Sequence, residues 1–277
     1  MTRDNIITHA SQFVNNSPGN YISAEIAINP SLVEMRIFDS PLLAFGCPND
    51  DIYAKYKSSE VIGEHFLPPL EWLPSAKTVI SFFLPYSEEI KLANSQNYDW
   101  PVDAWLHARY EGQLFLKELA IYIQNLLTDS GYESLIPSFD ARFKSGDSRD
   151  KSGSKANRFT SNWSERHIAY ACGLGTFGLS KGLITEKGIC GRFGSILTEL
   201  DLAKDNRQYN GVYEYCTMCG ACIPNCPVKA ISFDDGKTDL PCSNFLDKTF
   251  DKHNPRYGCG KCQVGVPCMN TAPGLGR

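Results

Sequence analysis

Long hydrophobic runs are absent from this chain of 277 residues, and its first residues lack the apolar core of an export signal. A membrane-spanning helix needs roughly 18 or more consecutive apolar residues, and no stretch approaches that length. Hydrophobic residues still make up 42% of the chain, which is enough for a sizeable buried core. We therefore expect a globular protein that is soluble and cytoplasmic and has no membrane partner.

An excess of basic residues is also absent. Lysine and arginine number 27 against 31 aspartate and glutamate residues, which gives a formal net charge of −4. Proteins that bind nucleic acids normally present a basic surface, because they neutralise phosphates. The composition therefore argues against nucleic acid as a partner, except at a local basic patch.

Cysteine, by contrast, is abundant, with 11 residues in the chain. Four of them form the run Cys216-Thr-Met-Cys219-Gly-Ala-Cys222-Ile-Pro-Asn-Cys226-Pro227. This C-x2-C-x2-C-x3-C-P spacing is typical of a ferredoxin [4Fe-4S] site. Three closely spaced thiolates bind one cluster there, and the cysteine before proline binds another in two-cluster ferredoxins. The run therefore predicts two clusters and requires a second set of cysteines.

The second set is present and consists of Cys242, Cys259, Cys262 and Cys268. In the most economical assignment of ligands, each cluster takes cysteines from both sets, and we call this assignment crossed. One cluster is then held by Cys216, Cys219, Cys222 and Cys268, and the other by Cys226, Cys242, Cys259 and Cys262. Five residues separate Cys262 from Cys268, more than in a ferredoxin repeat. The spacing therefore specifies the ligands of the second cluster less firmly than those of the first.

Two other uses of cysteine compete with clusters. Zinc also binds four cysteines, but usually through paired C-x2-C knuckles, and a tetrahedral ion needs neither a third closely spaced cysteine nor the Cys-Pro step. A disulfide framework suits a short secreted chain with an even number of cysteines, whereas this chain has 11. Cys47 lies outside the cluster set, and we expect it to be a packed small side chain.

Apolar patterns predict an α/β layer, a sheet covered by helices. The predicted strands are residues 42–46, 78–85, 134–137 and 195–200. The predicted helices are residues 102–127 and a shorter one that begins with the capping-box spacing Asn162–Glu165 and ends at Gly173. We expect this α/β domain over residues 1–205 and the cluster domain over residues 206–277.

Residues 144–160 are polar, rich in serine and glycine, and carry several basic side chains. A solvated loop is the ordinary interpretation of such a stretch. A lid over a ligand, or a contact for an anionic partner, is the sharper one.

Seven glycines lie between Gly173 and Gly194, and such glycines let the backbone approach a neighbour closely. The first three spell G-x-G-x-x-G, but they follow a helical pattern, whereas a dinucleotide-binding motif follows a strand. We therefore reject a Rossmann nicotinamide site. A turn-rich connector and a backbone that lines a ligand both stay open.

Three blocks, in this order, resemble one known family. They are Glu165–Gly178, Gly194–Leu202 and the two-cluster cysteine set, and a weaker echo lies at Ala104–Arg109. The order of the blocks resembles that of the epoxyqueuosine reductases, which are similar in turn to the catalytic core of the reductive dehalogenases. The resemblance covers residues from about 160 to 268.

The resemblance implies a nitroreductase-like α+β domain that binds cobalamin, beside a ferredoxin-like domain. The clusters would pass single electrons to a base-off corrinoid that reduces the substrate, while protein groups supply orientation and a proton. Parts of the glycine-rich segment would then line the corrin, namely Gly173, Gly175, Thr176, Phe177, Gly178, Ser180, Gly191, Gly194 and Ser195.

The resemblance also implies a general acid, and here the chain departs from the family. Its members place an aspartate just before the Glu-Arg helix, but residues 159–162 read Phe-Thr-Ser-Asn. The nearest replacement is Asp140, which also suits a structural salt bridge with Arg142. Tyr170 and His107 are further candidates, although a Tyr or His on an apolar helix is commonly just packed.

Many members of the family carry a C-terminal helical-repeat extension that helps to hold tRNA, and here nine residues follow Cys268. Together with the acidic balance, this points away from tRNA as the substrate.

The leading hypothesis is an oxidoreductase similar to epoxyqueuosine reductase, with two [4Fe-4S] clusters, a corrinoid and an electron donor of ferredoxin or flavodoxin type. The alternative is a non-catalytic electron carrier, or a reductive activator of a corrinoid protein partner.

Overall fold

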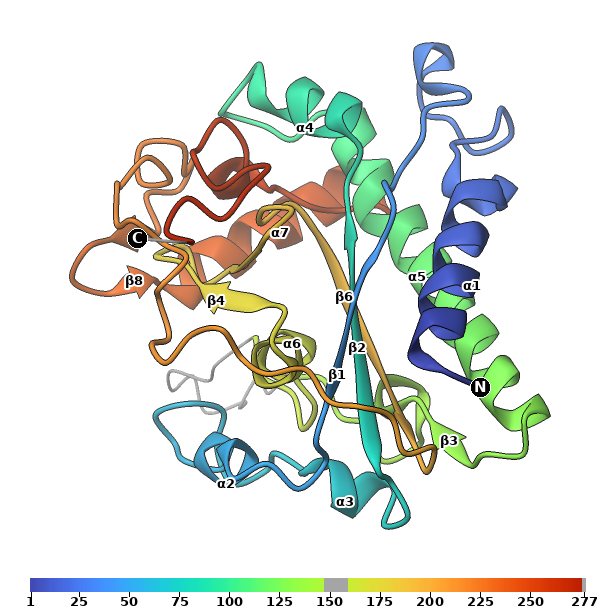
Figure 1. Cartoon of the computed structure of the whole chain (residues 1–277). Helices are drawn as coiled ribbons and strands as arrows, with labels where there is room; N and C mark the ends of the chain where they lie inside the picture. Colours follow the sequence, from blue (N-terminus) through green and yellow to red (C-terminus); the bar gives the residue numbers. More distant parts are fainter. Residues whose placement is uncertain (147–158, 276–277) are drawn as a thin grey trace.

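A four-stranded antiparallel sheet lies at the centre of the computed structural model, which describes residues 1–146 and 159–275 (Figure 1). The strand order is β1–β2–β6–β3, and each neighbouring pair is antiparallel. The four strands are β1 (Leu42–Gly46), β2 (Thr78–Pro85), β3 (Ser134–Leu135) and β6 (Gly191–Thr198). The predicted polar loop at 144–160 falls mostly outside the described residues.

Helices cover both faces of this sheet. The long helix α5 (Asp103–Asp129) packs against β6, and α1 (Arg3–Asn16) lies against α5. On the other side, α6 (Glu165–Cys172) contacts β1, β2 and β6 (Figure 1). All eight residues of β2 are consequently buried, and this double cover explains why its sequence is almost continuously apolar. The predicted α/β layer is confirmed.

The other elements are short. Before α5 the chain forms α2 (Ile52–Tyr56), α3 (Pro69–Trp72) and α4 (Glu88–Ser95). After α6 it forms the hairpin of β4 (Gly175–Phe177) and β5 (Leu183–Thr185), the hairpin of β7 (Ile231–Ser232) and β8 (Gly236–Lys237), and α7 (Asp239–His253). Single 3-10 turns occur at Pro18–Asn20, Pro30–Leu32, Pro137–Phe139 and Lys261–Gln263.

The predicted capping box is wrong. Ser164 precedes the first residue of α6, and the Asn162 side chain bonds the backbone of Arg142 and Lys144 instead. The predicted end of the helix is confirmed, because Gly173 takes a left-handed φ of 98° there.

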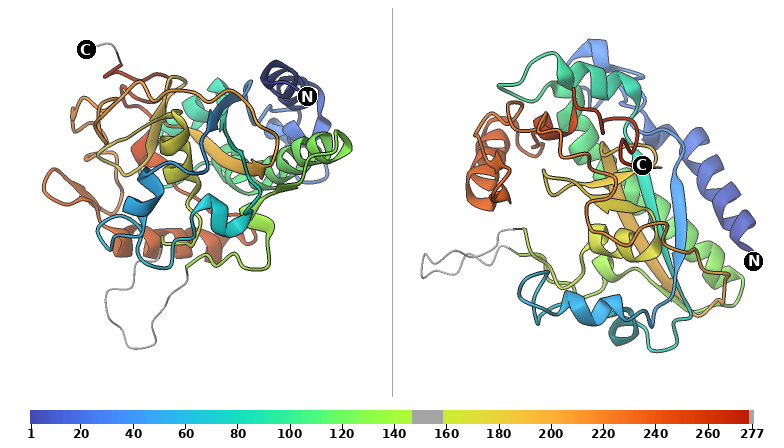
Figure 2. Two further views of the ribbon diagram at one scale, coloured as in Figure 1. Left: turned by 60° about the horizontal axis from the view of Figure 1, so that its bottom comes forward. Right: turned by 60° about the vertical axis from the view of Figure 1, so that its left-hand side comes forward.

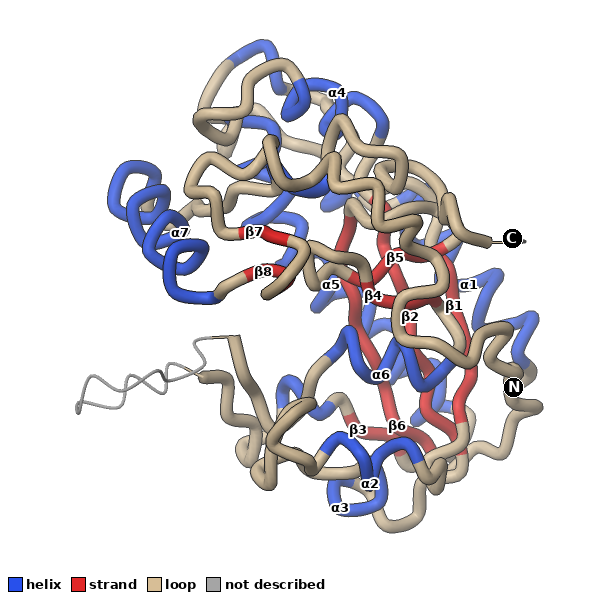
Figure 3. Tube along the Cα trace, turned by 90° about the vertical axis from the view of Figure 1, so that its left-hand side faces the viewer, coloured by secondary structure: helices blue, strands red, loops and turns tan. Residues whose placement is uncertain are grey.

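The C-terminal part carries the cluster cysteines mainly on loops, and it packs along one side of the α/β layer (Figures 2 and 3). Hydrogen bonds tie the two parts together. The Ile189 N–H donates to the Cys268 carbonyl at 2.9 Å, and the Asn94 amide donates to the Cys259 carbonyl at 3.0 Å. The division at residues 205 and 206 stays a prediction. Every helix in the described ranges is too short or too polar to cross a membrane.

The β4–β5 hairpin depends on the missing side chain of Gly175. A Cβ atom there would lie 1.9 Å from the Ile184 carbonyl oxygen, a backbone atom that cannot move without opening the hairpin. We therefore expect Gly175→Ala to lower the free energy of unfolding by about 1–3 kcal/mol, as overpacking does. Chemical denaturation measures this change.

Gly19→Ala is the matched control, because the nearest neighbour of its Cβ would be the flexible end of Glu118, at 3.0 Å, followed by the Phe115 ring at 3.4 Å and the Ser17 hydroxyl at 3.6 Å. We expect it to change stability by no more than about 0.5 kcal/mol. Equal losses in the two variants would contradict the proposed role of Gly175.

Candidate metal centre and adjoining cavity

All eleven cysteines are free thiols, and the eight predicted ligands lie on loops, on the 3-10 turn Lys261–Gln263 and, for Cys242, in α7. The Cys216–Cys226 loop turns back on itself through Met218 and Gly220, whose φ angles of 51° and 73° are left-handed. Glycine adopts such angles without strain, whereas methionine does so rarely.

The first group of thiols is centred on Cys268. Burial raises the pKa of Cys268 to about 12, and the negative charges of Cys216, Cys222 and Cys219 act on it in the same direction. Cys222, whose pKa is raised to about 11 mainly by burial, also senses Cys216 and Cys219. These four thiols are therefore neighbours across more than forty residues of sequence.

The second group is centred on Cys259. Its pKa is raised to about 12, mainly by burial, and Cys262, Cys242 and Cys226 contribute in the same direction. Cys242 has Cys262 and Cys226 as neighbours in turn. The groups adjoin each other, because Cys262 also raises the pKa of Cys222. This is the grouping that the crossed assignment proposes, and the ligand roles themselves stay a prediction.

The chemistry of these groups suits a polynuclear cluster. Mutually repelling, desolvated thiols resist ionisation, and bound metal supplies the positive charge that makes them thiolates. In the described parts of the chain, no three His, Cys, Asp or Glu side chains converge as a single metal ion requires. An iron–sulfur cluster sets its thiolates around a larger body than one ion does.

The described chain also forms a cavity of about 1050 Å³. It is enclosed by α2, the start of α6, the end of β4 and residues 207–213, and Asp239 at the start of α7 reaches it. Its aromatic lining includes Tyr56, His167, Tyr170, Phe177, Tyr209 and Tyr213. Cys47, which we expected to be packed, is exposed and lines this cavity, so that prediction is wrong.

Arg166 connects the cavity to the second thiol group. It lines the cavity, and its guanidinium donates to the Lys181 carbonyl oxygen. Burial lowers its pKa, whereas the negative charges of Asp239, Cys262 and Cys242 act in the opposite direction. The side chain therefore lies near both the cavity and these cysteines. Sequence reasoning missed Arg166 as a site residue, although it stands in the Glu-Arg block that carries the family resemblance.

Tyr170 is the one predicted acid among the cavity-lining residues of the described chain. Burial raises the pKa of its hydroxyl, which therefore keeps its proton at neutral pH. Its ring lies 4.9 Å from that of Tyr209, whose hydroxyl donates to the Tyr170 carbonyl at 2.6 Å. The residue is thus held from two sides while its ring borders the cavity.

His167 also lines the cavity, and sequence reasoning missed it. Its Nδ1 atom lies 2.8 Å from Ser164 Oγ, and Tyr56 donates to its carbonyl at 2.8 Å. The pKa of the imidazole is lowered to about 3, mainly by burial and in part by the positive charge of Arg166. It is therefore neutral at physiological pH and suits packing or hydrogen bonding to a ligand.

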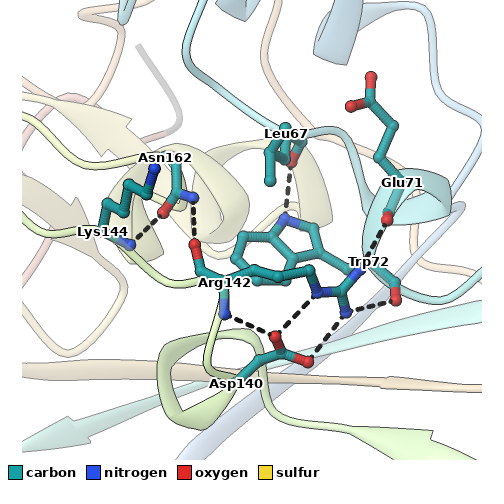
Figure 4. A network of polar contacts seen from close by, with 7 residues as sticks. All are labelled: Leu67, Glu71, Trp72, Asp140, Arg142, Lys144 and Asn162. Atoms are coloured by element: carbon teal, nitrogen blue, oxygen red, sulfur yellow. Dashed lines mark hydrogen bonds and ion pairs between the residues drawn. The ribbon is translucent and has the colours of Figure 1, made fainter.

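The other two predicted acids have structural partners. Asp140 accepts bonds from the Arg142 side chain at 2.8 Å, and these bonds lower its pKa to about 2 (Figure 4). Arg142 also bonds the Glu71 and Trp72 carbonyls and lies over the Trp72 ring. A carboxyl with this pKa holds no proton to donate at neutral pH.

His107 is fully buried in α5. Its Nε2 accepts the Ile28 N–H at 3.1 Å, so that Nδ1 carries the proton and faces Glu111 at 3.1 Å. Glu111 pairs in turn with Arg256. This network joins distant parts of the chain and is absent from the cavity lining in the described residues.

Among the predicted corrin-lining residues, Phe177 borders the cavity. The glycines meet protein instead. A Cβ at Gly191 would lie 2.2 Å from the Leu84 carbonyl, and one at Gly194 would lie 2.4 Å from the Phe82 ring. Close strand packing therefore accounts for these glycines without a ligand. The corrin-lining role stays a prediction for Gly173, Gly175, Thr176, Gly178, Ser180, Gly191, Gly194 and Ser195.

Comparison with known proteins agrees with this geometry. Residues 211–232 match the family of 4Fe-4S binding domains. A tetrachloroethene reductive dehalogenase of Desulfitobacterium hafniense is 34% identical over 110 residues, which are 37% of this chain and 20% of that protein. An epoxyqueuosine reductase of Francisella cf. novicida (strain Fx1) is 33% identical over 122 residues, which are 39% of this chain and 33% of that protein.

The chain is a homologue of both kinds of reductase. The matched segments span a third or less of these two relatives. A crystal structure of epoxyqueuosine reductase with a modified tRNA stem loop aligns with a TM-score of 0.50 at 18% identity, over 83% of this chain and 61% of that one. This likeness shows the fold, and with the 4Fe-4S match it confirms an α/β protein with a C-terminal ferredoxin-like region.

The crossed assignment predicts which cysteine substitutions act together. We expect Cys226→Ser, Cys242→Ser and Cys259→Ser each to remove one and the same cluster, and Cys216→Ser and Cys268→Ser to remove the other, because each cluster needs four thiolates. Iron analysis and low-temperature EPR of the reduced variants measure this, and Cys172→Ser is the control outside the set. Loss of the same EPR signal in Cys226→Ser and Cys216→Ser would contradict the crossing.

Proposed function

We propose that this protein is an iron–sulfur reductase in which two [4Fe-4S] clusters pass single electrons to a corrinoid bound in the 1050 Å³ cavity. The observation that carries the proposal is the position of Arg166, which lines the cavity and senses the charges of Cys242 and Cys262. Electrons that reach the second cluster would thus stand close to whatever the cavity holds. The reductase names of both relatives support this reading.

The cavity fits a large cofactor. Its volume lies just above the range of roughly 300–1,000 Å³ that small-molecule sites occupy, and its lining mixes aromatic rings with charged groups of both signs. When bound, the corrinoid supplies the two-electron nucleophile that attacks or reduces the substrate. In this proposal Phe177 and His167 pack against the cofactor.

Tyr170 is the proton donor in this proposal. Its raised pKa keeps the hydroxyl neutral, and the contacts with Tyr209 hold the ring in place beside the cavity. Arg207 acts in the opposite direction to burial on that pKa, and it is fixed by Asp50 at 2.6 Å. A neutral phenol with a nearby cation is able to donate its proton during the reaction and to be reprotonated from solvent.

The substrate is not a polyanion in this proposal. A solved epoxyqueuosine reductase binds a tRNA stem loop, but the net charge of this chain is −4, which disfavours tRNA. A small substrate that shares the cavity with the cofactor is the simpler reading.

Anaerobic reconstitution tests the proposal. We expect about eight irons per chain, since two [4Fe-4S] clusters contain that number, and retention of one cobalamin after gel filtration. Intact clusters without cobalamin retention would leave the protein as an electron carrier or as an activator of a corrinoid protein. Two zinc ions and no iron would overturn the cluster proposal.

Substitution of the proposed acid gives a second test. We expect Tyr170→Phe to slow reduction of the substrate by about 10²–10⁴, the usual contribution of a general acid, while iron content and cobalamin retention stay at the level of the unmodified protein. Turnover under anaerobic conditions, with a chemical reductant and a panel of halogenated and epoxide substrates, measures the rate.

Asp140→Asn is the control, because Asp140 pairs with Arg142 and lies outside the cavity lining of the described chain. We expect full turnover from this variant and only a small loss of stability, since exposed ion pairs contribute about 1 kcal/mol or less. Full activity of Tyr170→Phe, or its loss in Asp140→Asn, would reject Tyr170 as the donor.

A further inference from the structure

Lys261 is a fully buried lysine that lies between two of the predicted cluster ligands. It begins the 3-10 turn Lys261–Gln263, its neighbours in sequence include Cys259 and Cys262, and its exposed fraction is 0%. Lysine is almost never fully buried unless its charge is compensated. Its position therefore calls for a counter-charge.

The hydrogen-bond partners of Lys261 are neutral. Its Nζ donates to the backbone carbonyl and to the side-chain oxygen of Asn94, both at 2.8 Å. The Asn94 amide nitrogen donates to the Cys259 carbonyl at 3.0 Å. Asn94 and Lys261 thus join the end of α4 to the loop that carries Cys259, but neither oxygen removes the positive charge.

A second buried lysine nearby behaves differently. Lys91, on α4, is 5% exposed and forms an ion pair with Glu88 at 3.1 Å. Of these two lysines, Lys91 has a carboxylate at contact distance, whereas Lys261 has neutral hydrogen-bond partners and stands next to the predicted ligand Cys262 in the chain.

We propose that the Lys261 ammonium is the internal counter-charge of the cluster held by Cys226, Cys242, Cys259 and Cys262, and that it raises the reduction potential of that cluster. The inference rests on the proposed function, because it requires that cluster. A cluster bound by four thiolates is anionic and becomes more so on reduction, and a fixed positive charge stabilises the reduced form more than the oxidised form. Net charge and hydrogen bonding near the sulfurs are known to set such potentials.

A counter-charge at one cluster would also give electron transfer between the two clusters a preferred direction. If both clusters had similar surroundings, an electron would have no preference between them. A buried cation beside the second cluster would make that cluster the better acceptor, and two of its predicted ligands, Cys242 and Cys262, lie near Arg166, which lines the cavity. Lys261 would thus favour reduction of the second cluster over reduction of the first.

A potentiometric titration of the reconstituted protein tests this inference. Reduced samples poised with dithionite are followed by EPR, and the signal that is missing from Cys242→Ser identifies the second cluster. In Lys261→Met we expect its reduction equilibrium to shift toward the oxidised form by about tenfold, which is 59 mV for a one-electron couple. The first cluster should shift by clearly less.

Two further variants separate charge from structure. Lys261→Gln keeps a hydrogen-bond donor for Asn94 but removes the charge, and it should shift the second cluster as Lys261→Met does; it also serves if the methionine variant fails to fold. Lys91→Met removes the buried lysine that already has Glu88 as its partner, and it should leave both potentials nearly unchanged.

The outcomes are distinct. Intact clusters with an unmoved second potential in Lys261→Gln would overturn the counter-charge and leave the proposed function standing. An equal shift of both clusters, or the same shift in Lys91→Met, would also overturn it. An absence of iron–sulfur signals in the unmodified protein would overturn the proposed function itself.

Discussion

The site depends on the attachment of irregular loops to a rigid sheet. The cysteines of the C-terminal part lie mostly on turns, and such segments hold little shape by themselves. Hydrogen bonds to the α/β layer fix their positions. The Ile189 N–H donates to the Cys268 carbonyl, and the Asn94 amide donates to the Cys259 carbonyl. Cys190 Sγ lies 3.0 Å from the Gln263 carbonyl. Gly260 lies so close to the Trp105 indole that a Cβ would come within 1.9 Å of the ring.

Helix α6 is the element through which the sheet and the cavity meet. Toward the sheet, Ser195 donates to Glu165 at 2.6 Å and accepts from Trp163 at 3.0 Å. Toward the cavity, the same helix presents Arg166, His167 and Tyr170. One short helix therefore holds residues that border the cavity in place against the sheet. A disturbance of its sheet-facing contacts would be felt at the cavity.

Much of this arrangement could be predicted from residue patterns, but not all of it. The apolar run of β2, the periodicity of α5 and the left-handed Gly173 are local signals, and they predicted their elements well. The glycines after α6 were harder, because a glycine that lets a strand approach Phe82 and one that lines a ligand leave the same mark on a sequence. The capping box failed because Asn162 makes tertiary bonds to Arg142 and Lys144, and no spacing rule contains those partners. Arg166 and His167 were missed for a related reason: the cavity that they line, and the proximity of Arg166 to Asp239 and Cys262, exist only once the chain has folded.

Glu165 and Arg166, which are adjacent in α6, also explain how a positive charge is accommodated near the thiols and the cavity. Burial raises the pKa of Glu165 to about 8, so at pH 7 this carboxyl is mostly protonated and neutral. It therefore does not act as the anion that pairs with Arg166, and the charge of that guanidinium stays directed to Asp239 and the nearby cysteines. The helix thus keeps its sheet-facing side neutral and its cavity-facing side cationic. In the proposed function, such a cation near an anionic cluster and a ligand would lower the electrostatic cost of placing an electron at either one, without the reorganisation that water would require.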